Sequence, residues 1–164
     1  MIAINLPNIK TCMAHLLLKE TFDDFLFIEG EIVTANTFTI DGFIQKKFFE
    51  KDTGLIPEYT SWSALRDYCF SIIKGKRTPL SFKFIYSMSP DAIQKLITSA
   101  SLDVDPHEIQ GLYLNIKYDG EHLICITGTS FKSFSLDKTL EKAWDGYVQK
   151  FFEGCGIEYA KMEG

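Results

Sequence analysis

The fold class follows from one stretch of the sequence, residues 112–128, which reads LYLNIKYDGEHLICITG. Apolar residues occupy alternate positions before the Asp119-Gly120 pair. This period of two is typical of a strand with one buried face. Asp-Gly between two such runs is a strong signal for a tight hairpin turn. The stretch therefore predicts two antiparallel strands, over residues 112–118 and 122–128.

The rest of the chain adds further strands and four helices to this hairpin. Strand patterns cover residues 2–6, 25–34, 37–45, 80–88 and 157–162. Helical spacing of apolar residues, with capping residues at the ends, covers residues 7–20, 61–74, 89–100 and 137–153. The polar residues 46–60 are the best candidate for a mobile loop. Together these elements predict an α+β fold with an antiparallel sheet and packed helices.

The predicted elements follow the order β-α-β-β-α twice, with one strand after them. Residues 40–48, IDGFIQKKF, and 126–134, ITGTSFKSF, share Ile, Gly, Lys and Phe at four of nine positions. We expect one domain over 1–164, duplicated internally with halves of about 1–79 and 80–164. Two ordinary hairpins followed by helices would give the same order by chance. A duplicated sheet would resemble saddle-shaped DNA binders and sliding-clamp domains by analogy alone, which carries no function.

Composition and charge narrow the classes of partner. The 164 residues include 14 Phe, 7 Tyr and 2 Trp, which fill a core or cover an interface. A net charge of −5 disfavours broad attraction to nucleic acids or anionic membranes, without excluding a local basic patch. No apolar run is long enough to span a membrane, so no membrane partner is expected.

The N-terminal residues and the cysteines indicate a cytoplasmic protein. The first residues lack the basic and apolar regions of a signal peptide. The cysteines at 12, 69, 125 and 155 form no Cys-x-x-Cys motif. We expect them to be reduced, with the first three buried among apolar neighbours.

Two basic spots are candidate binding sites for an anion or an acidic partner. The first comprises Lys74, Lys76 and Arg77, at the end of a predicted helix, where cations also complement the helix dipole. It is not a nucleotide-binding P-loop, because the helix ends there and a glycine is missing. The second comprises Lys46 and Lys47 beside two phenylalanines, a combination that suits single-stranded nucleic acid. Lysines that extend from a strand end are the structural alternative.

The sequence contains few groups of residues that could carry out catalysis or bind a metal. Asp41, before a glycine at a strand end, is the candidate cleft carboxylate, and the capping of a turn is the structural alternative. The loop 103–108 carries acidic residues and His107 but lacks the EF-hand pattern, so no metal is expected. No serine-hydrolase motif occurs. We predict no catalytic residues and no cofactor.

Four stretches together resemble one protein family: Phe38–Gly42, Ile73–Leu80, Leu114–Gly120 and Ile126–Thr129. In this order they are similar to a family of uncharacterised small proteins from Clostridia-type Firmicutes, and the similarity covers nearly the whole chain. The resemblance implies a bacterial, cytoplasmic protein. It implies no activity and no catalytic residues.

Three hypotheses about function follow. The first is a non-enzymatic binding or assembly module, with a protein partner or a second copy, because aromatic residues are abundant without a reactive constellation. The second is a nucleic-acid-associated protein that uses the basic spots. The third is an enzyme of unrecognised type, with Asp41 or a histidine in a pocket.

Overall fold

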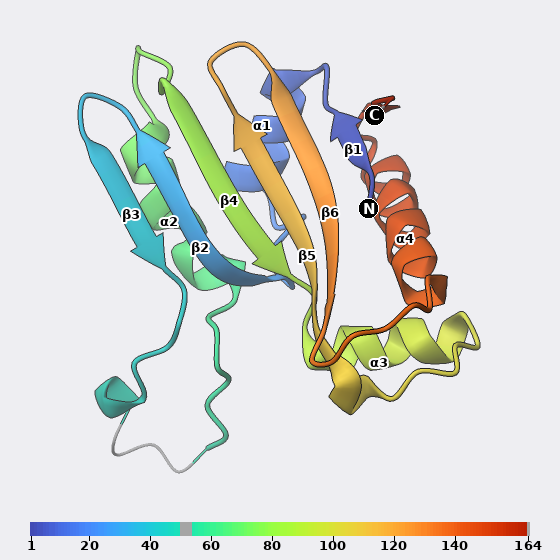
Figure 1. Ribbon diagram of the computed structural model, residues 1–164. Helices are drawn as coiled ribbons and strands as arrows, with labels where there is room; N and C mark the ends of the chain where they lie inside the picture. Colours follow the sequence, from blue (N-terminus) through green and yellow to red (C-terminus); the bar gives the residue numbers. More distant parts are fainter. Residues whose placement is uncertain (50–53, 164) are drawn as a thin grey trace.

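The computed structural model describes residues 1–49 and 54–163. Within them, an antiparallel sheet has the strand order β3-β2-β4-β5-β6-β1-β7 (Figure 1). Its strands are β1 (Ala3–Asn5), β2 (Leu26–Val33), β3 (Thr37–Asp41), β4 (Ser81–Ser87), β5 (Ile109–Tyr118), β6 (Leu123–Phe131) and β7 (Ala160–Lys161). The helices are α1 (Ile9–Leu17), α2 (Trp62–Ile73), α3 (Pro90–Ser99) and α4 (Thr139–Cys155), with short 3-10 turns η1 (Lys46–Phe49) and η2 (Pro106–Glu108). The predicted α+β class is confirmed.

The hairpin predicted over residues 112–128 forms as expected. β5 and β6 pair from Ile109 opposite Phe131 to Tyr118 opposite Leu123. At the turn, Gly120 has φ of 99°, in the region that favours glycine. The Asp119 carboxylate accepts hydrogen bonds from the backbone N–H groups of Glu121 and His122, at 2.8 and 2.7 Å. Local turn chemistry therefore sets the register of these two strands.

One face of the sheet carries the core. Its side chains, such as Phe27, Phe84 and Leu114, are fully buried. Figure 1 shows α1 and α2 behind this sheet and α4 beside β6 and β1. The Trp62 indole N–H donates to the carbonyl of Leu16 at 2.9 Å, which ties α2 to α1. The Trp144 indole N–H likewise donates to the carbonyl of Tyr113 at 3.1 Å, so both buried tryptophans have partners for their polar atoms.

The opposite face, which points toward the viewer in Figure 1, is not covered by α1, α2 or α4. Along β4, buried Phe82, Phe84 and Tyr86 alternate with exposed Lys83 and half-buried Ile85. We call this second side the open face. α3 lies beneath one end of the sheet, near the first residues of β5.

The predicted internal duplication is not confirmed, because the two halves pair differently. β4 lies between β2 and β5, so it joins both hairpins. Its counterpart in the first half, β1, pairs instead with β6 and β7. The shared order of elements therefore does not correspond to a two-fold arrangement of strands.

The strand predicted over 37–45 ends early, at Asp41. The chain then turns, and Phe43 makes only an isolated bridge to Tyr59. The predicted mobile loop, 46–60, contains η1 and the backbone hydrogen-bonded residues Glu58 and Thr60; its residues 50–53 lie outside the described part of the chain.

The expected burial of the first three cysteines is confirmed. Cys12, Cys69 and Cys125 are buried, Cys155 is half-buried, and all four are free. Burial raises the pKa of the Cys12 and Cys69 thiols to about 12. Across residues 1–49 and 54–163, no helix combines the length and the apolar character that a membrane crossing needs.

Candidate binding surface

The open face changes character from one edge of the sheet to the other. Two rows of residues, each opposite the next on the neighbouring strand, cross it. The rows are Glu29, Ile85, Asn115, Ile126 and Ala3, and Glu31, Lys83, Lys117, Ile124 and Asn5. The face is therefore acidic over β2, basic over β4 and β5, and aliphatic over β6.

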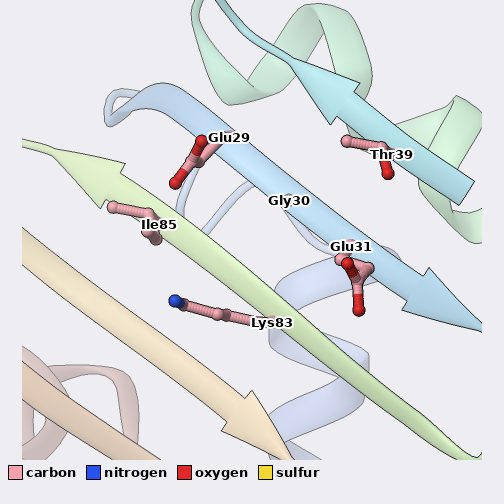
Figure 2. Close-up of a pocket in the computed structure, with 6 residues that line it drawn as sticks. All are labelled: Glu29, Gly30, Glu31, Thr39, Lys83 and Ile85. Atoms are coloured by element: carbon pink, nitrogen blue, oxygen red, sulfur yellow. The ribbon is translucent and has the colours of Figure 1, made fainter.

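Figure 2 shows the acidic and basic parts of this face meeting in a shallow hollow. The hollow has a volume of about 160 Å³ and lies between β2, β3 and β4. Lys83 faces Glu31 on one side and Lys117 on the other. Among the described residues, neither lysine forms an ion pair within 4.0 Å. Like charges directly opposite each other on neighbouring strands destabilise a sheet.

A larger cleft, of about 270 Å³, lies at the end of the sheet near α3. Its lining comes from separate parts of the chain: the start of β2, the segment 57–59, the end of β4 with the start of α3, and the segment from η2 into β5. The lining residues are Leu26, Ile28, Pro57, Glu58, Tyr59, Ser87, Met88, Pro90, Ile93, Pro106, Ile109, Gln110 and Tyr113. We call this site the apolar cleft.

One wall of the apolar cleft is held by backbone hydrogen bonds. The N–H of Ile44 donates to the carbonyl of Glu58 at 2.9 Å, and that of Thr60 donates to Gly42 at 3.0 Å. The N–H of Phe27 in turn donates to Thr60 at 2.8 Å. The segment 57–60 is thereby fixed against both the start of β2 and the residues after β3.

Gly42 makes this arrangement possible. A Cβ atom at this position would lie 1.9 Å from the carbonyl oxygen of Phe27, so a side chain cannot be accommodated without moving the backbone. Next to it, the rings of Phe43 and Tyr59 pack edge to face with centroids 5.7 Å apart. This contact positions the Tyr59 ring at the cleft wall.

The lining determines which groups the apolar cleft can accept. Glu58 is the only charged residue among those that line it. Burial, with smaller contributions from nearby Tyr59 and Glu58, raises the pKa of Tyr113, so this phenol stays neutral. The described lining holds no His, Cys or Lys that could pair with a nucleophile. An apolar group suits this cleft, whereas an anion does not.

The structure does not bring the two predicted basic spots together. Lys46 and Lys47 lie on η1, beyond the end of the sheet that holds the apolar cleft. Lys74, Lys76 and Arg77 follow α2, at the opposite end of the sheet in Figure 1. All five side chains are exposed, and none of them lines the apolar cleft.

Asp41 lies at the end of β3, exposed and outside the apolar cleft. Its Oδ1 atom accepts a hydrogen bond from the backbone N–H of Phe43 at 2.9 Å. This contact is the turn-capping arrangement that its sequence pattern also allowed.

The histidines and the acidic loop are dispersed. His15 is buried on α1, where its Nδ1 lies 2.7 Å from the Thr21 hydroxyl. His107 and His122 are exposed next to Asp105 and Asp119. No group of three metal-binding side chains occurs in the part of the chain that the structure describes.

Sequence reasoning did not identify the apolar cleft. Each lining segment contributes only two to four residues, and none has a motif of its own. The nearest signal was the pair Asp41-Gly42, where a glycine follows a strand, but its partner residues are distant in the sequence.

Comparisons with known proteins identify the family without assigning an activity. Neither the curated proteins nor the solved structures include a match to this chain. The model of a family of unknown function (DUF5721) matches residues 15–160, and the chain therefore belongs to this family.

Proposed function

We propose that this protein is a non-enzymatic binding module that accepts an apolar side chain of a partner protein in the apolar cleft. The observation that carries the proposal is the cleft lining, in which aliphatic, proline and tyrosine side chains from four segments surround one carboxylate. Buried apolar anchors in such pockets provide much of the affinity of protein interfaces.

The size of the cleft supports this choice of ligand. Pockets for small molecules have volumes of roughly 300–1,000 Å³. The apolar cleft, at about 270 Å³, lies just below that range and suits a single large side chain. The open face beside it offers aliphatic and charged residues that would contact the rest of the partner.

The placement of the basic residues favours a protein partner over a nucleic acid. A bound strand needs a continuous positive groove along its phosphates. Here Lys46 and Lys47, on η1, lie beyond one end of the sheet, whereas Lys74, Lys76 and Arg77, which follow α2, lie at its opposite end (Figure 1). The open face also carries the acidic side chains of Glu29 and Glu31 on β2, which would repel a phosphate backbone.

We further propose that the protein is bacterial and cytoplasmic, as the resemblance of its sequence stretches to a family from Clostridia-type Firmicutes implies. Four free cysteines, three of them buried, support a reducing compartment.

Affinity capture tests the proposal. The tagged protein is incubated with lysate of cells that express it naturally, with and without nuclease, and bound proteins are identified by mass spectrometry. We expect a stoichiometric partner that survives nuclease. The variant Glu58→Trp places a bulky ring at the exposed rim of the cleft and should abolish capture.

Glu121→Trp is the matched control, because Glu121 is exposed in the hairpin turn and does not line the cleft. It should capture the partner as the unmodified protein does. A partner that Glu58→Trp still retains would contradict the cleft as the binding site. Partners that disappear with nuclease would instead indicate a nucleic-acid-associated protein.

A further inference from the structure

The two edges of the sheet differ in how they are protected against pairing. β7 is short, with two residues, and one of them is Lys161. Short strands and lysines are common devices that keep an edge from pairing with another chain. β3, at the other edge, reads TFTID and carries neither a lysine nor a proline. Its threonine, phenylalanine and isoleucine residues are strong strand formers.

Hydrogen bonds next to β3 show which of its backbone groups face outward. The N–H of Gly42 donates to Ile28, and the N–H of Thr34 donates to Asn36, at 2.8 and 2.9 Å. Because hydrogen-bonded pairs alternate along an antiparallel ladder, even-numbered residues of β3 bond to β2. The N–H and C=O groups of Thr37, Thr39 and Asp41 therefore point away from the sheet.

The β3 edge is complementary to itself. If two copies pair in antiparallel orientation about Thr39, this residue faces its own copy and Thr37 faces Asp41. Each of these pairs exchanges both backbone hydrogen bonds. Phe38 then faces Ile40 in a pair without backbone bonds, where side chains approach most closely. No like charges meet in this register.

The flank of α2 next to β3 extends this surface. Leu65, Tyr68 and Ile72 are spaced three and four residues apart, so they share one side of the helix. Arg66 lies on the other side, where its guanidinium binds Asp23 and the carbonyl of Lys19. Leu65, Tyr68 and Ile72, which we call the α2 stripe, therefore face the β3 edge, because α2 lies behind β2 and β3 (Figure 1).

This stripe has the character of an interface. Leu65 and Ile72 pack against the core, while Tyr68 is 70% exposed and Phe38, on the same side of the sheet, is 38% exposed. The stripe contains no charged residue, although 24% of the chain is charged. Charge depletion with exposed aromatic residues is typical of the centre of an interface.

We propose that two copies of this chain associate through β3 and the α2 stripe, which joins their sheets into one. The two-fold axis passes between the paired Thr39 residues, perpendicular to the sheet, so both α2 helices lie on the same side. The two β2 strands are then three strand spacings apart, about 14 Å. This separation leaves room for the Tyr68 and Phe38 side chains of both copies between the helices.

Sedimentation velocity over a range of protein concentrations tests the association. We expect a monomer–dimer equilibrium for the unmodified protein. Thr39→Pro removes an outward N–H without touching the ladder to β2, and it should weaken dimerisation at least tenfold. Thr39→Val keeps the backbone donor and a branched side chain, so it should dimerise normally. A monomer at every concentration, or equal dimerisation of Thr39→Pro, would overturn the proposal.

Cross-linking tests the register. In a Cys155→Ser background, which removes the half-buried thiol, Thr39→Cys should be joined to its copy by a short bis-maleimide. Thr37→Cys should not, because its copy lies four residues along the paired strand, roughly 13 Å away. Equal yields for the two variants would refute this register. Glu58→Trp should dimerise normally, so failure of this proposal and failure of the proposed binding function are distinguishable.

Discussion

The two faces of the sheet use neighbouring residues for different purposes. On β4, Phe84 and Tyr86 point into the aromatic core, where Phe84 lies 5.3 Å from Trp62 between ring centroids. Lys83 and Ile85, one position away, point to the open face. The covered face holds the fold together, and the open face is left free for charges and for the apolar cleft. Side chains that stabilise the core and side chains that remain available on the open face therefore alternate along the same strand.

The largest expected effect on stability comes from a substitution on the covered face. Phe84→Ala should lower the free energy of unfolding by about 3–5 kcal/mol, because it leaves a cavity among aromatic rings. Ile85→Ala, on the open face, should cost no more than about 1 kcal/mol, because that side chain is only half-buried. Urea unfolding of both variants measures the difference. Equal losses would mean that the two faces are not distinct.

The second prediction concerns the wall of the apolar cleft. Gly42→Ala should destabilise the protein by about 1–3 kcal/mol, because the new methyl group would overlap the carbonyl of Phe27. Gly146→Ala is the control: it lies within α4 with no atom within 4 Å of its Cβ position. There alanine should stabilise the helix by roughly 0.5–1 kcal/mol. Thermal unfolding of the two variants should give shifts of opposite sign.

The third prediction uses pH to test the covered layer. Burial, and to a smaller extent Lys19, lowers the pKa of His15 in the folded protein. The unfolded chain therefore binds a proton more readily, so stability should fall as pH decreases through about 6.5. His15→Gln should remove this part of the pH dependence, while His107→Gln should retain it. Stability that stays constant between about pH 7.5 and 5.5 would contradict the burial of His15.

The smallest expected effect concerns the open face. Lys117→Glu replaces the like-charged pair with Lys83 by an opposite-charged pair. It should stabilise the sheet by about 0.2–1 kcal/mol at low salt. The gain should shrink in high salt, because the pair is exposed. Urea unfolding at two salt concentrations measures this; a salt-independent gain would have to come from another cause.

Local signals explain why most elements could be predicted from the sequence. The Ser89 side chain caps α3 by accepting from the N–H of Ala92 at 3.3 Å, with Pro90 in the first turn. The end of a helix is harder to predict where two glycines lie close together, because either of them could end it. The predicted end of the last helix at residue 153 is too early, since α4 continues past Gly154 to Cys155 and Gly156 adopts the left-handed conformation with φ of 71°.

Long-range pairing explains what the sequence could not show. The pairing of β1 with β6 joins residues more than a hundred positions apart, and no alternation pattern specifies a partner. The apolar cleft is hidden for the same reason, because Ile28, Tyr59 and Tyr113 meet only after the sheet has formed. By contrast, the exposed basic residues were visible in the sequence, but their separation at opposite ends of the sheet was not.

The most direct test of the apolar cleft is an NMR titration of the isotopically labelled protein with indole as an apolar probe. We predict saturable shifts of backbone amides in Leu26, Tyr59 and Tyr113, which line the cleft. These shifts should disappear in Glu58→Trp and persist in Glu121→Trp. Shifts that do not saturate, or that cluster away from the cleft, would contradict the proposal that this site binds an apolar side chain.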